Sequence, residues 1–364
     1  MIKKILVAAV SGILLVGAAQ ADDLLSSKPA SKFTMQQNYA VLSQLPFNDK
    51  QDFEFAAKGL IAKPKSKQIK NAKGEIVWDL AKFDFLNQDK FIASINPSLQ
   101  RQAQLNMNYG LFKVTDRIYQ VRGFDLTNIT YIKGDTGWII FDPLTVPESA
   151  KAAHALVTKY LGERPVKAVV YSHAHVDHFG GVKGVISQEQ VDNGEVQVIA
   201  PRDFMEHVVK ETVLAGNAMA RRSSYQYGIM MPKNKYGVVD GALGKGVPTG
   251  LVGLITPTYI VEKDQETLNI DGVEMVFENA PNTESPSEMI TWFPQLKTLW
   301  MAENTVAGMH NLYTIRGAQA RDAATWSKSI NQALQTYGVK ADVLMASHHW
   351  PRWGKNNIVK YLEK

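Results

Sequence analysis

The stretch His173-Ala174-His175-Val176-Asp177-His178 follows directly on the apolar run 166–172, VKAVVYS. That run has the length and β-branched content of a buried strand. Along an extended backbone, residues two apart point to the same side, so His173 and His175 can converge on one metal ion. Asp177 and His178 can face a second ion as the chain turns toward Gly180-Gly181. Imidazole and carboxylate groups suit zinc, so this motif predicts a metal site at a strand end.

The composition restricts both the site and the partners. The chain has no cysteine, which excludes disulfides and thiolate metal ligands and leaves His, Asp and Glu as donors. The formal net charge is only +5, and the Lys and Arg residues are scattered. The basic stretch 63–67 is typical of a solvated loop. This balance argues against nucleic acid as a partner.

The first 21 residues have the pattern of a secretory signal peptide. Lys3 and Lys4 precede an apolar core over 5–16, and Ala19-Gln20-Ala21 has the small residues of a cleavage site. The apolar core is short for a membrane span. We therefore expect a periplasmic or secreted protein without an integral membrane anchor after cleavage. A retained N-terminal anchor is the alternative.

Two further regions are expected after the signal. Residues 22–104 are polar and weakly periodic, with helical stretches such as 52–62, and form an N-terminal extension packed on a catalytic domain over 105–364. Strands are expected at 118–121, 128–133, 138–141, 166–172, 196–200, 266–270, 273–278, 289–293, 298–301 and 343–347. Helices are expected at 150–161, capped by Ser149, at 203–223 and at 320–337. Two β-rich halves with interspersed helices predict an α/β (α+β) fold, an αββα sandwich.

Further ligand candidates also follow strands. Glu284 comes just after the hairpin 266–278, Glu303 follows the strand 298–301, and His348 ends the strand 343–347. His349 is the rival of His348. Strand exits can be brought back to one edge of the sandwich, so these side chains are candidates for completing the site.

Several motifs resemble one known family. The His-rich motif resembles the signature of the metallo-β-lactamase superfamily, whose members are mostly hydrolases. Glutamates at 284 and 303 resemble its alkylsulfatase branch, because ordinary metallo-β-lactamases carry a histidine and an aspartate or cysteine there. The segment 282–289, NTESPSEM, resembles that branch's TEAPAEM segment. Other similar segments are 120–123 (QVRG), 217–222 (NAMARR), 310–318 (HNLYTIRGA) and 347–354 (SHHWPRWG), and the similarity runs from about 38 to 354.

The resemblance implies an αββα metallo-β-lactamase sandwich with two Zn²⁺ per chain. By position, one zinc is held by His173, His175 and Glu284, and the other by Asp177, His178 and His348, while Glu303 bridges the pair. Asp142, at a strand end, corresponds to the acidic residue that supports a ligand from behind. Asn311 and Arg316 lie in the segment that holds the sulfate, with Arg221, Arg222 and Arg321 as weaker candidates.

The implied activity is hydrolysis of alkyl sulfate esters to an alcohol and inorganic sulfate by a metal-bound hydroxide, with Asp177 and Glu303 as its catalytic ligands. Two zinc ions, three carboxylates and a hydroxide leave no net charge, so the anionic substrate needs Arg316. Preference for primary or secondary esters, and attack at sulfur or carbon, stay open. Tyr225, Tyr227, Met230 and Met231 are candidates for an alkyl channel, although such residues are more often core.

Two alternatives remain. Another hydrolase of the same fold, a lactamase or a phosphodiesterase, is disfavoured by the two glutamates. The resembling enzymes continue with a helical dimerisation domain and a sterol-carrier-like domain, whereas this chain ends at Lys364. Without those regions the homodimer of the resembling enzymes is in doubt, and we expect weaker selectivity for long chains. A metal-loaded but inactive binding protein is therefore the second alternative.

Overall fold

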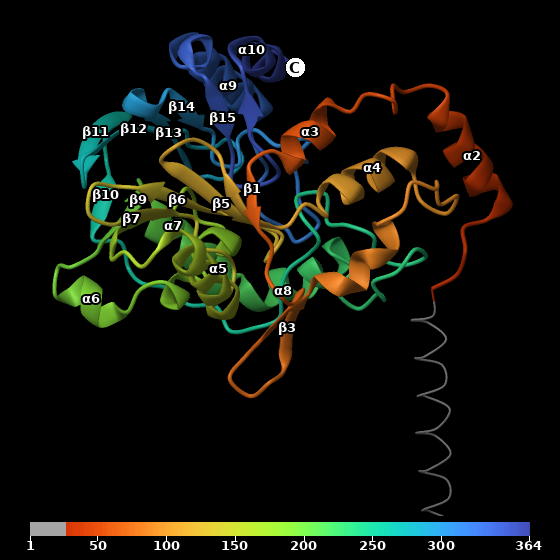
Figure 1. Cartoon of the computed structure of the whole chain (residues 1–364), viewed down its shortest axis with the longest axis horizontal. Helices are drawn as coiled ribbons and strands as arrows, with labels where there is room; N and C mark the ends of the chain where they lie inside the picture. The colour runs from red at the N-terminus through yellow and green to blue at the C-terminus, as the bar shows by residue number, and fades with distance from the viewer. Residues whose placement is uncertain (1–26) are drawn as a thin grey trace, which may run out of the picture.

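Two β-sheets packed face to face form the centre of the computed structural model, which describes residues 27–364. The larger sheet has the strand order β1-β4-β5-β6-β7-β8-β9-β10, and the smaller has the order β11-β12-β13-β14-β15-β16. Helices cover the outer face of each sheet (Figure 1). This arrangement confirms the predicted αββα sandwich. The predicted signal peptide lies outside the described residues.

The larger sheet contains β1 (Leu60–Ala62), β4 (Gly110–Lys113), β5 (Ile118–Arg122), β6 (Ile129–Lys133), β7 (Trp138–Phe141), β8 (Val166–Val170), β9 (Gln197–Pro201) and β10 (Tyr259–Val261). The smaller contains β11 (Gln265–Ile270), β12 (Val273–Asn279), β13 (Met289–Phe293), β14 (Thr298–Trp300), β15 (Val343–Met345) and β16 (Arg352–Trp353). A separate hairpin pairs β2 (Gln68–Lys70) with β3 (Ile76–Asp79). The helices are α2 (Lys32–Leu42), α3 (Gln51–Ala57), α4 (Pro97–Leu105), α5 (Pro147–Leu161), α6 (Gln188–Asp192), α7 (Phe204–Val208), α8 (Gly216–Gln226), α9 (Ala323–Thr336) and α10 (Lys355–Leu362).

The alternation of side chains along each strand builds two layers of core. On β7, Ile139 and Phe141 face the smaller sheet, whereas Trp138 and Ile140 face α5. Phe141 meets Trp300 of β14, with 4.8 Å between the ring centroids. Successive strand residues point to opposite faces, and a sheet covered on both sides therefore consists almost entirely of apolar residues.

Helices close the outer faces. Ala153, Leu156 and Val157 of α5 pack on the larger sheet, and α5 ends at Gly162, whose φ is 87°. Leu334 of α9 and Ile358 of α10 pack on the smaller sheet. Within residues 27–364, no helix is both long enough and apolar enough to cross a membrane.

The N-terminal region is built into the sandwich through β1, which pairs antiparallel with β4. The expected helix over 52–62 is therefore wrong in its second half, because α3 ends at Ala57 and the chain becomes a strand. Gly59 has φ 78°, and a Cβ there would lie 2.0 Å from the Lys113 carbonyl oxygen. Only a glycine allows this close approach to the neighbouring strand.

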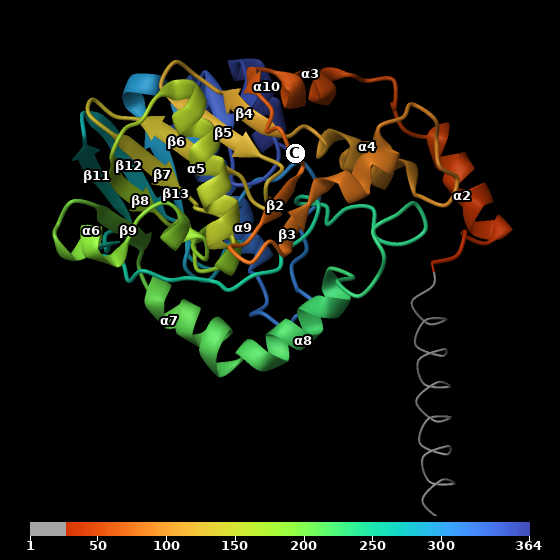
Figure 2. The ribbon, with the colours of Figure 1, turned by 60° about the horizontal axis from the view of Figure 1, so that its bottom comes forward.

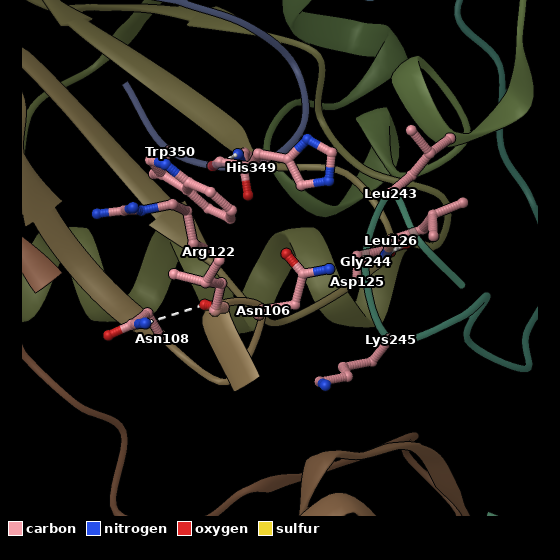
Figure 3. Close-up of a pocket in the computed structure, with 13 residues that line it drawn as sticks. Asn106, Asn108, Arg122, Asp125, Leu126, Leu243, Gly244, Lys245, His349 and Trp350 are labelled. Atoms are coloured by element: carbon pink, nitrogen blue, oxygen red, sulfur yellow. Dashed lines mark hydrogen bonds between the residues drawn. The ribbon is translucent and has the colours of Figure 1, made fainter. Parts of the chain in front are cut away.

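A small cavity marks where this region meets the sandwich (Figure 3). It measures about 20 Å³ and lies among Asn106, Arg122, Lys245 and His349. Asn106 follows α4, and Lys245 belongs to the glycine-rich loop over 237–253, which contains neither helix nor strand. Residues distant in sequence therefore line the same cavity.

Two further helix predictions need correction. Ser149 does not cap α5, because the helix begins at Pro147 after Val146 and buries Ser149 in its first turn. Proline suits the first helical position, where its missing N–H costs nothing. The stretch 203–223 is not one α-helix, because α7 passes into a π-helical turn (Val209–Leu214) before α8 begins. Helical periodicity alone cannot distinguish such a π-turn, which is often found at functional sites.

Candidate metal centre and substrate pocket

Two side-chain groups meet at the strand ends that the sequence singled out. His173, His175, Glu284 and Glu303 each offer one ligand atom to the first group, and these atoms lie within 4.8 Å of one another. His175 Nδ1 lies 3.0 Å from both His173 Nε2 and Glu284 Oε2. All four residues are buried. The pairing of His173 with His175 agrees with their two-residue spacing.

The second group contains Asp177, His178, Glu303 and His348. Glu303 Oε2 lies 3.0 Å from the Nε2 atoms of both His178 and His348. Asp177 Oδ2 lies 3.2 Å from His178 Nε2. Glu303 belongs to both groups, so the structure divides the seven residues in the way that the resemblance implied.

Three histidine rings of the two groups are oriented by contacts at their Nδ1 atoms, which point away from the shared centre. Asp142 Oδ2 lies 2.8 Å from His178 Nδ1 and also accepts a hydrogen bond from the Ser172 hydroxyl. Ser172 Oγ in turn lies 2.9 Å from His173 Nδ1. The Nδ1 atom of His348 lies 3.1 Å from the Leu126 carbonyl oxygen. Because these partners are acceptors for Nδ1–H, the Nε2 lone pairs face the shared centre.

The centre has the properties of a cation site. Within residues 27–364, His178 Nε2 and Glu284 Oε2 are buried and make no hydrogen bond of good geometry, although ligand atoms of the same groups lie 3.0 Å away. Burial acts to raise the pKa of each of Asp177, Glu284 and Glu303, but neighbouring imidazoles lower all three below their usual values. Ionised carboxylates and imidazole lone pairs directed at one another are the donor set of a divalent metal. The histidine and carboxylate groups therefore indicate metal binding.

Glu288 is a buried carboxylate for which the sequence analysis gave no role. It is fully buried, and its Oε1 accepts from the Glu303 backbone N–H, while Oε2 accepts from the Ser285 backbone N–H. Burial, and then the nearby charges of Glu284 and Glu303, raise the pKa of Glu288 well above its usual value. One side chain thus connects the two loops that carry the glutamates of the centre.

Arg321 has a larger part in the site than the sequence suggested. Its guanidinium pairs with the Glu284 carboxylate and donates to Asn311 Oδ1 at 2.5 Å. Its side chain is 5% exposed. The arginine therefore fixes a cluster carboxylate and Asn311 together, a contact that no local motif reveals.

Arg316 lies on the open side of the first group. Its Nη2 atom is 2.7 Å from His175 Nε2 and 3.6 Å from Glu211 Oε2. Burial acts to lower the pKa of Arg316, but the Glu211 carboxylate and other anionic groups raise it overall. Glu211 belongs to the π-helical turn. No sequence signal marks Glu211, because a single acid in a helical pattern is typical of an exposed residue.

His310 is a further imidazole beside the centre. Its Nε2 atom lies 3.1 Å from Glu303 Oε1, and its Nδ1 lies 2.9 Å from the Asn311 carbonyl oxygen. In the sequence, His310 was recognisable only as part of the segment 310–318, which resembles the alkylsulfatase branch. It lies outside both ligand groups and faces Glu303 Oε1, whereas Glu303 Oε2 faces the histidines of the two groups.

His348 and His349 take different places. His348 joins the second group, whereas His349 has φ 65° and turns away. His349 Nδ1 accepts from the Ala307 N–H, and Nε2 lies 2.7 Å from the Ala242 carbonyl oxygen. Its ring therefore connects the glycine-rich loop to the loop after Glu303 from outside the centre.

A pocket of about 740 Å³ opens onto the centre. Its polar end includes His175, Asp177, Glu303, His310, Asn311 and Arg316, and its apolar part includes Leu126, Val176, Met219, Ile229, Leu243 and Val252. Of the four candidates for an alkyl channel, Tyr227 lines this pocket, while Tyr225, Met230 and Met231 lie outside its lining. A pocket with one polar end and apolar walls suits an amphiphilic ligand.

The fold and the two-part site are those of one enzyme superfamily. The family model described as the metallo-beta-lactamase superfamily matches residues 122–348, and the chain belongs to this superfamily. Within it, the chain is similar to alkylsulfatases. It is 47% identical over 343 residues to an (R)-specific secondary-alkylsulfatase of a Pseudomonas species, covering 94% of this chain and 52% of that protein.

Two further relatives agree. The alkyl/aryl-sulfatase BDS1 of Saccharomyces cerevisiae is 46% identical, with 93% of this chain and 52% of that protein covered. The solved structure of the stereoselective inverting sec-alkylsulfatase Pisa1 from Pseudomonas is 47% identical and superposes with a TM-score of 0.90. That match covers 93% of this chain and 54% of the other. The chain therefore spans about half the length of these relatives.

Proposed function

We propose that this protein is a metal-dependent hydrolase that cleaves alkyl sulfate esters into an alcohol and inorganic sulfate, with two Zn²⁺ per chain. The observation that carries the proposal is the convergence of seven His, Asp and Glu residues into two groups that share Glu303, at the polar end of a pocket with apolar walls. The names of the similar alkylsulfatases support the substrate class.

His173, His175 and Glu284 would hold one ion, and Asp177, His178 and His348 the other, with Glu303 between them. When bound, such a pair of ions supplies a water of lowered pKa near neutral pH and attracts anionic oxygens. The protein would keep the carboxylate donors ionised and orient the imidazole donors. Asp142 contacts His178 Nδ1, and Arg321 pairs with the Glu284 carboxylate.

Arg316 would bind the sulfate group. A His175 ring that binds a cation through its Nδ1 lone pair carries its proton on Nε2. That N–H cannot accept from Arg316, which now lies 2.7 Å away, so the guanidinium is left free for an anion. Guanidinium offers paired donors to tetrahedral oxyanions and keeps its charge at any physiological pH.

His310 and Asn311 would complete the polar end. His310 Nε2 lies 3.1 Å from Glu303 Oε1 and would help to position the carboxylate that both groups share. Asn311 is held by Arg321, so its position depends on the same arginine that fixes Glu284. The apolar walls, including Met219 and Ile229, would exclude water around the alkyl tail.

The deciding experiment measures the zinc content of the purified protein and the release of sulfate from alkyl sulfates. Nitrocefin and a bis(p-nitrophenyl) phosphate substrate serve as counter-assays for lactamase and phosphodiesterase activity. Hydrolysis in heavy-oxygen water then shows whether the label enters sulfate or alcohol, which separates attack at sulfur from attack at carbon. A zinc-loaded protein that releases no sulfate from any alkyl sulfate would contradict the proposal.

We propose a periplasmic or secreted location from the N-terminal sequence motif alone. The Lys3-Lys4 start, the apolar stretch 5–16 and the Ala19-Gln20-Ala21 site support secretion or a periplasmic location. Mass spectrometry of the N-terminus after expression with a signal peptidase tests it. A mature protein that retains residues 1–21 would contradict cleavage.

A further inference from the structure

Exposed apolar side chains occur on the two segments that line the pocket. We call Leu214, Tyr225, Met230, Met309, Tyr313 and Ile315 the apolar rim; each is at least 66% exposed. Single exposed apolar residues are ordinary on a protein surface, but several of them on the segments that line a binding pocket indicate a contact surface.

The rim comes from two segments that lie against each other. One is the π-turn, α8 and the residues after it, and the other is the loop after Glu303. The Arg316 backbone N–H donates to Gln226 Oε1 at 3.0 Å, which joins the loop to α8. Both segments line the pocket, through Met219 and Ile229 on one side and Thr314 on the other. Figure 2 shows α7 and α8 along one side of the molecule, outside the two sheets.

Basic residues outnumber acidic ones on the same segments, where the π-turn contributes Lys210 and also Glu211, which lies beside Arg316. Residues 212–239 and 304–321 contain no Asp or Glu, whereas they contain Arg221, Arg222, Lys233, Lys235, Arg316 and Arg321. Of these, Arg221, Arg222 and Lys235 are exposed. Arg321 is already paired with Glu284. These two segments thus carry both exposed apolar and exposed cationic side chains.

We propose that the apolar rim docks onto a layer of anionic amphiphiles, so that a substrate molecule passes from the layer into the pocket without crossing bulk water. The proposal rests on the proposed function, because that function makes the substrate an anionic amphiphile. Apolar side chains bury at the boundary between head groups and chains, while nearby Lys and Arg attract anionic head groups. The exposed apolar side chains of the rim, together with the exposed Arg221, Arg222 and Lys235, match both requirements.

The test measures co-sedimentation of the full chain with phosphatidylcholine vesicles, with and without phosphatidylglycerol. Neither lipid carries a sulfate ester, so binding is independent of catalysis. We expect binding only with the anionic lipid, and weaker binding at high salt. The rim variant is Leu214→Ser with Tyr225→Ser and Met309→Ser, none of which lines the pocket. Its matched control is Phe33→Ser with Ile76→Ser and Tyr160→Ser, which are exposed elsewhere.

The charge arm uses Arg221→Gln with Lys235→Gln against Lys63→Gln with Lys65→Gln. Each cation near an anionic surface contributes roughly fivefold, so the first pair should weaken vesicle binding at least about tenfold and the control pair should not. Glu303→Ala should bind vesicles like the parent protein even if it binds no metal, which separates this proposal from the proposed function.

Three results would overturn the docking proposal. The first is no binding to phosphatidylglycerol vesicles. The second is equal loss of binding in the rim variant and its control. The third is a parent protein that is a dimer in sedimentation velocity and a rim variant that is a monomer but binds vesicles as the parent does. The rim would then contact a second copy of the chain. In each of these cases the protein should still release sulfate from a short alkyl sulfate that forms no micelles, so the proposed function would not be contradicted.

Discussion

The Glu288 carboxylate accepts a hydrogen bond from the backbone N–H of Glu303, with 3.0 Å between Oε1 and N. The other oxygen accepts from the Ser285 N–H, next to Glu284. Both glutamates of the candidate metal centre are therefore positioned through one buried side chain. This relationship joins a loop after β12 to a loop after β14, although the two lie in different parts of the sequence.

Glu288→Gln should lower metal affinity. Glutamine keeps one oxygen for Glu303 but replaces the other with an amide NH₂, which leaves the buried Ser285 N–H without an acceptor at a cost of about 1–3 kcal/mol. We expect a loss of roughly 10- to 100-fold in zinc affinity, measured by competition with a chelator. The matched control is Glu278→Gln, a buried glutamate whose partners are Tyr337 and Gln332. Equal zinc affinity in both variants would remove Glu288 from this role.

Glu303→Ala should affect both ions at once. Because Glu303 belongs to both ligand groups, we expect about two zinc equivalents in the parent protein and loss or disorder of both in the variant, measured by elemental analysis after dialysis. Glu163→Ala, at an exposed position, is the control. A variant that keeps one tightly bound zinc would show that Glu303 serves only one of the groups.

Arg316→Ala and Arg321→Ala should have different effects. Arg316 faces the pocket, so its loss should leave the zinc content intact and lower kcat/KM roughly 10- to 150-fold, the equivalent of about 1.5–3 kcal/mol. Arg316→Lys should recover only part, because an ammonium lacks paired donors. Arg321 pairs with Glu284, so its loss should lower zinc affinity as well. Identical metal and kinetic profiles for the two alanine variants would contradict this separation.

The dependence on alkyl chain length should be shallow. Complete burial of each CH₂ contributes about 0.8 kcal/mol, so a closed channel would favour dodecyl over hexyl sulfate by up to roughly 5 kcal/mol. The pocket is only partly enclosed, since Leu251 in its wall is 88% exposed. The check is kcat/KM for a series of alkyl sulfates below micelle-forming concentrations. A rise that approaches the full value per CH₂ would show that this chain builds a closed channel unaided.

The sequence by itself determined the sandwich and the positions of the ligand candidates. Strand β8 is recognisable because a strand buried on both faces must be apolar throughout, and the His173–His178 motif follows at its end. The turn at Asp271-Gly272 was equally readable, because both residues adopt positive φ there, as this two-residue hairpin requires. These features depend on local backbone chemistry, which a single sequence carries.

Only the tertiary structure decided which polar groups face each other. The hydrogen bonds from Glu303 to Glu288, from Arg321 to the Glu284 loop and from Ser172 to Asp142 join residues up to 37 positions apart. No periodicity predicts them, because each depends on how two strand ends meet at one edge of the sandwich. The π-helical turn that places Glu211 near Arg316 also depends on packing, since its local sequence suits an ordinary helix. The candidate ligands can thus be recognised from local sequence, whereas their orientation and charge balance depend on contacts that form only in the folded chain.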